Sequence, residues 1–231
     1  MNNKHPIIPL KHISKVYETE EVESHVLTDI NLEVAQGDYI SISGPSGSGK
    51  STLLSILGLL DQPSSGEYFV DGVRVDSLSM TESAKIRGEK IGFIFQSFNL
   101  IDDLSVLENV MLPLKYHAAW NDTDAMIAQA EECLKRVGLE HRMTHKPNQL
   151  SGGQQQRVGI ARSIVASPSV LLVDEPTGNL DSKSGDLVLD VLNQLHQDGA
   201  TICLVTHDPR YADLAHTKYT LTDGIIAQSK G

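Results

Sequence analysis

The chain has 231 residues, with 19 Lys or Arg against 30 Asp or Glu, so its formal net charge at pH 7 is −11. This acidic balance argues against a protein that binds nucleic acid without regard to sequence, because such a protein needs a basic surface. Two cysteines far apart exclude a disulfide scaffold, and no apolar run approaches the roughly 20 residues of a membrane-spanning helix.

Segments typical of strands and of helices follow one another through the first part of the chain. A strand is predicted at 38–43, and a glycine-rich turn separates it from a helix predicted at 51–57. An Asp-Gly pair between β-forming residues predicts a hairpin at 69–75. A short apolar run then predicts a buried strand at 91–95.

The stretch 97–160 has helical patterns only. Ser105, followed three residues later by Glu108, is a capping box that begins a helix. Apolar residues at helical spacing over 127–137 predict another helix, which Gly138 ends. We therefore expect a helical insertion between two strands.

The strand pattern resumes after this insertion. Strands are predicted at 170–173 and 201–205, with a helix between them, and an Asp-Gly pair at 223–224 predicts a closing hairpin. Apolar strands that alternate with helices predict an α/β fold with a parallel sheet. The hairpins near both ends predict a small antiparallel addition.

The motif G-x-x-x-x-G-K-[ST] lies between the first predicted strand and its helix. Glycines let the backbone fold closely around phosphates, and the helix adds its positive N-terminal end. Lys50 would reach the β- and γ-phosphates, and Ser51 would offer a hydroxyl to Mg²⁺. The alternative, a flexible Gly/Ser turn, does not explain the strand before the motif and the helix behind it. The candidate nucleotide-binding residues here are Gly44, Ser46, Gly47, Ser48, Gly49, Lys50, Ser51 and Thr52.

Two carboxylates, Asp174 and Glu175, end the apolar run at 170–173. Asp174 at the strand end could hold Mg²⁺, and Glu175 could polarise a water molecule. Two exposed loop acids would look the same in isolation. The phosphate-binding motif upstream favours the catalytic interpretation, because phosphoryl transfer needs both a metal holder and a group that positions water.

A second glycine motif, Leu150-Ser151-Gly152-Gly153-Gln154, begins another helical pattern. By itself it predicts a helix start with a serine N-cap, or a second anion site at a helix N-terminus. It resembles the Leu-Ser-Gly-Gly-Gln signature of ATP-binding cassette (ABC) proteins. With the other two motifs in place, the resemblance covers essentially the whole chain.

The resemblance implies a P-loop NTPase fold with a RecA-like parallel sheet core, an antiparallel β addition and a helical subdomain insertion. It implies one nucleotide-binding domain over 1–231. Residues 1–96 and 161–231 would form the core ATP-binding lobe, and 97–160 the helical signature subdomain.

The resemblance also implies residue roles. Glu175 would be the catalytic base, with His207 at the γ-phosphate. His207 could also be a solvated loop histidine, but its place after a strand, at the carboxyl edge of an open sheet, favours the first role. Tyr17 would stack on adenine, or be a half-buried strand aromatic. Gln96 would contact Mg²⁺ and sense the transport domain, or be an ordinary polar residue at a strand end.

The implied sets are then complete. The catalytic residues are Glu175, His207 and Lys50. The remaining nucleotide-binding residues are Tyr17, Gln96, Ser151, Gly152, Gly153, Gln154 and Asp181. The Mg²⁺ ligands are Ser51, Gln96 and Asp174, the last through water.

ATP and Mg²⁺ are the implied cofactors. One chain carries one phosphate loop and one signature, so the resemblance implies a homodimer in which each signature closes over the other copy's ATP. It further implies an integral membrane permease, a periplasmic adaptor reached through it, a place at the cytoplasmic face of the inner membrane, and no nucleic-acid partner. Residues 98–101 would contact the permease.

Several segments resemble the lipoprotein-releasing (LolD) and macrolide-export (MacB) group, among them 58–66, 92–96, 109–114 and 175–181. The implied function is ATP hydrolysis that powers export, efflux or lipoprotein release. The alternative is a soluble ABC ATPase, or an ATP-gated dimerising scaffold, without a link to transport.

Overall fold

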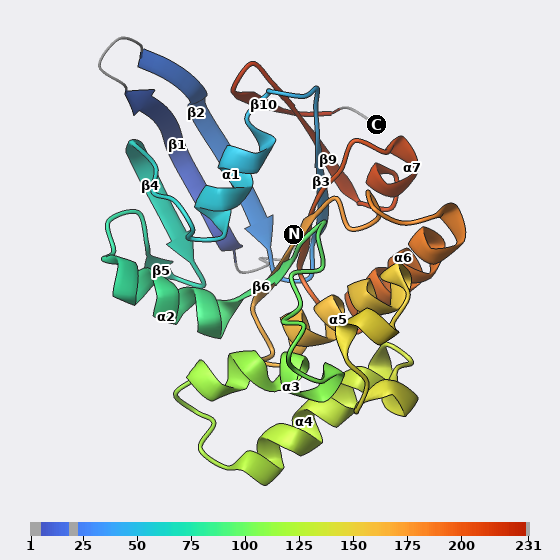
Figure 1. The fold of residues 1–231 in the computed structure, drawn as a ribbon. Helices are drawn as coiled ribbons and strands as arrows, with labels where there is room; N and C mark the ends of the chain where they lie inside the picture. Colours follow the sequence, from blue (N-terminus) through green and yellow to red (C-terminus); the bar gives the residue numbers. More distant parts are fainter. Residues whose placement is uncertain (1–5, 19–22, 230–231) are drawn as a thin grey trace.

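The computed structural model describes residues 6–18 and 23–229, and these form two sheets with helices around them (Figure 1). The six-stranded sheet has the order β10-β9-β3-β8-β7-β6, and every neighbouring pair is parallel except β9 and β10. Its strands are β3 (Tyr39–Ser43), β6 (Ile91–Ile94), β7 (Val170–Asp174), β8 (Ile202–Val205), β9 (Thr217–Thr222) and β10 (Ile225–Gln228). The predicted parallel sheet and closing hairpin are confirmed.

The second sheet is antiparallel, with the order β2-β1-β4-β5. Its strands are β1 (Pro6–Glu18), β2 (Glu23–Ala35), β4 (Ser65–Val70) and β5 (Val73–Arg74). The predicted hairpin is the β4–β5 pair, and Asp71 and Gly72 at its turn both have positive φ, as a tight hairpin turn requires. The antiparallel part is therefore a full sheet, larger than the addition expected from the sequence.

Within residues 6–18 and 23–229, seven α-helices connect and cover the strands. They are α1 (Lys50–Leu57), α2 (Met80–Lys90), α3 (Val106–Met111), α4 (Thr123–Arg136), α5 (Gly152–Ile164), α6 (Ser182–Gln197) and α7 (Pro209–Ala212). Short 3₁₀ helices span Leu112–Tyr116, Glu140–Arg142 and Pro147–Gln149. No helix of the described residues is both long and apolar enough to cross a bilayer.

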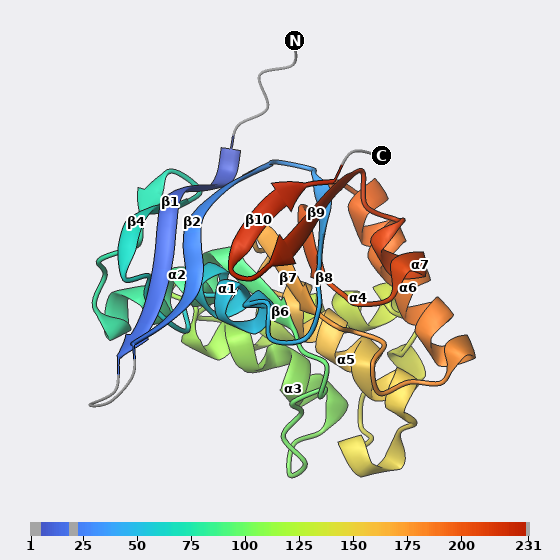
Figure 2. The ribbon, with the colours of Figure 1, turned by 90° about the horizontal axis from the view of Figure 1, so that it is seen from above.

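Four neighbouring strands of the parallel sheet, β3, β8, β7 and β6, are mostly buried, and their side chains alternate between two hydrophobic cores. Leu171 and Val173 of β7 face a core shared with α3 to α6, while Val170 and Leu172 face a core shared with α1 and the antiparallel sheet. Figure 2 shows α1 between the two sheets and α6 on the other side of the parallel sheet. This packing holds the N-terminus of α1 at the sheet edge.

The helical stretch after β6 contains α3, α4 and the first part of α5, which lie at the end of the molecule away from the antiparallel sheet (Figure 1). The capping box at Ser105 is confirmed, since its side chain accepts from the Glu108 N–H and the Glu108 carboxylate accepts from the Ser105 N–H. Helix α4 ends at Arg136 with Val137 as its C-cap, and the next residue, Gly138, has φ +67, as the glycine of a helix stop does.

The long β1–β2 hairpin and α2 were not predicted. Register shifts interrupt β1, and His12 has positive φ, so the strand lacks the clean two-residue alternation that marks a strand in sequence. Helix α2 buries only Ser83, so it carries no apolar stripe that could be recognised.

Candidate functional site

The loop 44–49 leaves the end of β3 and enters α1 at Lys50. The N-cap of α1 is Gly49, which has φ +102, and no described side chain caps the helix. The N–H groups of its first turn therefore remain available to an anion, and the helix dipole favours one there. The loop is also held from outside, because the Ser48 carbonyl accepts from the N–H of Gly224 in the β9–β10 turn at 3.2 Å.

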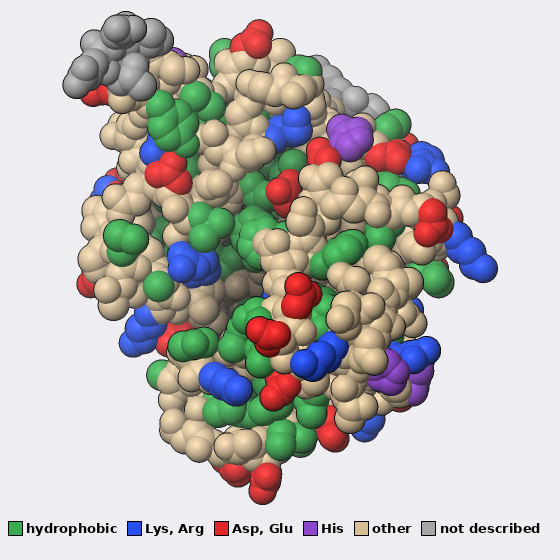
Figure 3. Space-filling model, in the orientation of Figure 1, with side chains coloured by type: hydrophobic (Ala, Val, Ile, Leu, Met, Phe, Trp, Pro, Cys, Tyr) green, Lys and Arg blue, Asp and Glu red, His purple; other side chains and the backbone are tan. Residues whose placement is uncertain are grey.

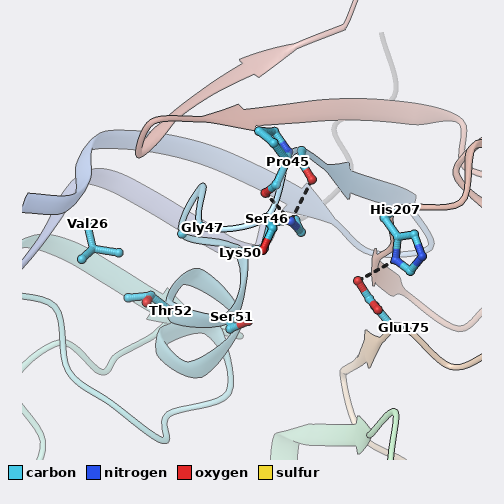
Figure 4. Close-up of a pocket in the computed structure, with 11 residues that line it drawn as sticks. Val26, Pro45, Ser46, Gly47, Lys50, Ser51, Thr52, Glu175 and His207 are labelled. Carbon is cyan, nitrogen blue, oxygen red and sulfur yellow. Dashed lines mark hydrogen bonds and ion pairs between the residues drawn. The ribbon is translucent and has the colours of Figure 1, made fainter. Parts of the chain in front are cut away.

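Lys50 folds back over this loop. Its Nζ donates to the carbonyl oxygens of Gly44 and Pro45, both at 2.8 Å (Figure 4). These two bonds place the ammonium group above the loop, on the side where its N–H groups and the positive end of α1 would meet phosphate oxygens.

Gly44 lies where no side chain fits, because an added Cβ would be 2.1 Å from the Leu221 carbonyl oxygen. We expect Gly44→Ala to lower the free energy of unfolding by about 1–3 kcal/mol, the usual cost of overpacking. Gly88→Ala is the matched control, since it lies inside α2 with nothing within 4 Å of an added Cβ. Urea unfolding of the two variants tests this, and equal stabilities would contradict the steric argument.

A cavity of about 670 Å³ opens over the phosphate loop. Its lining comes from β2, the loop with the start of α1, the end of β7 and the end of β8, and comprises Val26, Gly44, Pro45, Ser46, Gly47, Gly49, Lys50, Ser51, Thr52, Glu175 and His207. The structure thus brings Glu175 and His207 to the predicted loop. Val26 and Pro45 were not singled out from the sequence; Val26 lies on the unpredicted strand β2.

Glu175 and His207 form a pair at one end of this cavity (Figure 4). His207 Nδ1 lies 2.9 Å from Glu175 Oε1, and the imidazole is 67% exposed while the carboxylate is 22% exposed. Glu175 has φ +40, which is unusual for a residue with a side chain and is the kind of strain found at functional sites. The Glu175 N–H donates to the Val205 carbonyl at 2.9 Å, so β8 holds the backbone in this conformation.

Asp174 is the last residue of β7 and directly precedes Glu175 in the chain. Burial raises the pKa of its carboxyl, the neighbouring Glu175 raises it further, and the Lys50 ammonium lowers it. The charge of Lys50 thus acts on the Asp174 carboxyl, although Asp174 does not line the cavity.

A magnesium ion suits these donors. Ser51 lines the cavity, and Asp174 precedes the cavity residue Glu175 in the chain. Mg²⁺ commonly takes only one or two protein oxygens together with water and phosphate. No group of three or more His, Cys, Asp or Glu side chains with metal-binding geometry occurs among the described residues, so a site built wholly from such side chains is not what this region offers.

The signature segment lies outside this cavity. Ser151 caps α5, and its hydroxyl accepts from the Gln154 N–H while the Gln154 side chain accepts from the Ser151 N–H. An added Cβ at Gly153 would be 2.9 Å from Ser184, and Asp181 caps α6 through that same serine. The predicted signature residues and Asp181 thus lie together, on a different part of the chain from the phosphate loop.

Gln96 lies just after β6 and contacts the segment that follows Glu175. The Asn179 side chain donates to the Gln96 carbonyl at 3.1 Å, and an added Cβ at Gly178 would be 2.7 Å from Gln96 Nε2. Neither Gln96 nor Tyr17 lines the cavity. Their proposed contacts with Mg²⁺ and adenine stay predictions.

The chain is similar to proteins of a known family. Residues 27–178 match the family model described as "ABC transporter". The chain is 48% identical over 225 residues to the macrolide export ATP-binding/permease protein MacB 1/2 of Paracoccus denitrificans, which covers 97% of this chain but 33% of that protein. It therefore spans about a third of the length of this MacB relative.

A relative of matching length is the uncharacterised ABC transporter ATP-binding protein MJ0796 of Methanocaldococcus jannaschii, 46% identical over 228 residues and 97% of both chains. A solved dimer of MJ0796 in a post-hydrolysis state bound to ADP and Pi has a TM-score of 0.87 at 43% identity and covers 97% of this chain and 99% of that chain. The structure of cbiO1 from Clostridium perfringens, part of a cbiONQ transporter complex, has a TM-score of 0.84 at 29% identity, covering 98% of this chain and 89% of that one.

Proposed function

The chain belongs to the ABC transporter family as one of its ATP-binding, ATP-hydrolysing domains, and from that premise we propose that two copies close around MgATP to power a membrane permease. The work would be export, efflux or lipoprotein release, as in the group that includes the MacB relatives. The observation that carries the proposal is the single cavity that joins the phosphate loop to the Glu175–His207 pair.

The residues divide the reaction between them. Lys50 and the free N–H groups at the start of α1 bind the β- and γ-phosphates. Glu175 accepts a proton from the attacking water, and His207 keeps the carboxylate turned toward the γ-phosphate through its 2.9 Å contact. Ser51 and, through water, Asp174 would hold Mg²⁺, which would offset charge on the phosphates. Gln96 would complete its coordination, and Tyr17 would stack on the base.

The dimer accounts for the separate position of the signature. Ser151 is exposed and, with Gly152, Gly153 and Gln154, lies away from the cavity of its own chain. In a two-fold symmetric pair, this helix N-terminus would face the γ-phosphate held by the other copy. Asp181, exposed at the start of α6, would meet the second copy at the same interface. The solved MJ0796 dimer supports this assembly.

The permease would dock beside the loop that follows Gln96. A groove of about 330 Å³ runs between α2, β6, this loop and α5, and its lining includes Ala84, Phe95 and Asn99. Figure 3 shows this face hollowed, with hydrophobic side chains gathered on the side of the helical segment. An amphipathic segment of the permease fits such a lining, because the groove offers aromatic rings beside polar groups.

Helix α5 clamps the loop in place. The Arg162 guanidinium donates to the Asn99 carbonyl at 2.6 Å and to the Phe98 carbonyl at 2.9 Å. The Gln156 side chain donates to the Phe95 carbonyl at 3.2 Å. A movement of this loop would therefore be passed to α5, whose N-terminus carries the signature. In the proposed division, 97–160 is the helical signature subdomain, and Arg162 joins its first residues to the adjoining ATP-binding lobe.

The first experiment is a pull-down from detergent-solubilised membranes with tagged Glu175→Gln protein, with and without MgATP. We expect a membrane permease to be recovered. Its recovery would support a place for this chain at the cytoplasmic face of the inner membrane. A periplasmic adaptor recovered with it would extend the assembly beyond the permease. Recovery of soluble proteins only, in both conditions, would contradict the link to transport and favour a soluble ATPase or scaffold.

The groove gives a sharper test of docking. We expect Ala84→Glu to lower recovery of the permease at least 10-fold, because a charged side chain would enter the groove, while basal ATP hydrolysis stays within 2-fold. Lys85→Glu is the matched control, since Lys85 is exposed on the same helix but does not line the groove. Equal recovery with both variants would place the permease elsewhere.

A further inference from the structure

The nucleotide cavity has two ends, and the second is close to the antiparallel sheet. Val26 and Thr52 lie on one side of the phosphate loop, and Glu175 and His207 lie on the other (Figure 4). A triphosphate whose γ-phosphate faces Glu175 would therefore direct its nucleoside toward Val26, on β2. This orientation rests on the proposed function.

Tyr17 lies on β1, which pairs with β2 next to Val26. Tyr17 is opposite Ser24, and Lys15 is opposite Leu27 in the same ladder. Tyr17 is 43% exposed, which leaves aromatic surface uncovered near the nucleoside end of the cavity. An exposed ring at this place suits a planar base.

Two side chains from different segments hold this ring. The Tyr17 hydroxyl donates to Asp61 Oδ2 at 2.9 Å. Lys15 Nζ donates to Asp61 Oδ1 and to the Gln62 carbonyl, both at 2.8 Å, and lies 4.8 Å from the centroid of the Tyr17 ring. The Lys15 side chain is only 11% exposed, so the lysine occupies one ring face and leaves the other to a ligand.

Asp61 in turn is attached to α1. Its N–H donates to the Ser55 carbonyl at 3.2 Å, and its Oδ1 accepts from the Gln62 N–H at 2.7 Å. Helix α1 thus meets the phosphates at its N-terminus and sets the position of Asp61 just beyond its C-terminus. The distance between phosphate loop and ring is then set by one rigid element.

We propose that Asp61 and Lys15 are positioning residues that fix the Tyr17 ring as the platform for the purine base. Asp61 sets the rotation of the ring through the hydroxyl, and Lys15 supports its rear face. Neither residue would touch the phosphates. We therefore expect them to affect binding of the base and not binding of the triphosphate.

The test compares two ligands by calorimetry, MgATP and inorganic tripolyphosphate with Mg²⁺. Tyr17→Phe keeps the ring but loses the hydroxyl, and Asp61→Asn removes the charge that holds Lys15 and the hydroxyl. We expect each variant to raise the Kd for MgATP roughly 3- to 10-fold, the worth of one hydrogen bond. The Kd for tripolyphosphate should stay unchanged.

The double variant should bind MgATP no more weakly than the weaker of the two single variants, because both act through one contact. Glu67→Gln is the matched control, since this carboxylate lies on the same sheet and pairs with Arg74 instead. A general loss of folding would weaken both ligands equally, which the comparison would reveal.

The outcomes separate this inference from the function on which it rests. If Tyr17→Ala weakens MgATP binding while Tyr17→Phe and Asp61→Asn do not, the platform stands and the positioning role is overturned. If Tyr17→Ala also leaves MgATP binding unchanged, the platform itself is wrong. If the unaltered protein binds neither ligand, the proposed function fails first.

Discussion

Replacing Glu175 with glutamine is expected to lower the rate of ATP hydrolysis by about 10²–10⁴-fold, the usual contribution of a positioned base. The amide keeps the shape of the carboxylate but cannot accept the proton of the attacking water. ATP binding should persist, because Lys50 and the N-terminus of α1 are unchanged. Phosphate release measures the first effect, and a nucleotide titration measures the second.

The same variant should accumulate as an ATP-bound dimer, which size-exclusion chromatography with and without MgATP would detect. Glu140→Gln is the control, because that carboxylate is exposed on the helical segment and does not line the cavity. Turnover close to that of the unaltered protein would remove Glu175 from the role of base and leave the His207 contact without a catalytic purpose.

Replacing Lys50 with alanine should raise the Kd for MgATP roughly 10- to 100-fold, which is the range of a charge-assisted hydrogen bond lost from a binding site. Lys50 lies above the loop through its bonds to the Gly44 and Pro45 carbonyls, so its ammonium is already placed for the phosphates. Titration with a fluorescent ATP analogue measures the change.

Lys85→Ala, on the exposed face of α2, controls for the loss of one positive charge from an acidic protein. Unfolding by urea would show whether the loop still folds when its two carbonyls lose their partner. An unchanged affinity in a folded Lys50→Ala protein would mean that backbone N–H groups alone bind the phosphates.

Short-range sequence patterns predicted most of the strands and helices that surround the site. The phosphate loop, the acidic end of β7 and the capped start of α5 each depend on residues close together in the chain, so their patterns predicted both element and chemistry. The parallel sheet followed from apolar strands alternating with helices. By contrast, the irregular register of β1 and the nearly unburied helix α2 lacked a period to recognise.

The sequence indicated the phosphate loop, Glu175 and His207, which the structure brings to one cavity, but it did not indicate their contacts. Glu175 and His207 are 32 positions apart, and Tyr17 and Asp61 are 44 positions apart. Such pairs form only when the strands assemble into sheets. The residue pattern of one strand does not predict which strand will lie next to it. Val26 entered the cavity for the same reason, from a strand that was not predicted.

The sequence by itself determined the family, the phosphate-binding chemistry and the α/β class, because each rests on short-range residue patterns with a direct physical meaning. Only the tertiary structure decided that Glu175 pairs with His207 and that Asp61 and Lys15 hold Tyr17. The reason is that these contacts join separate segments, and burial of the two cores on either side of the parallel sheet is what brings those segments together.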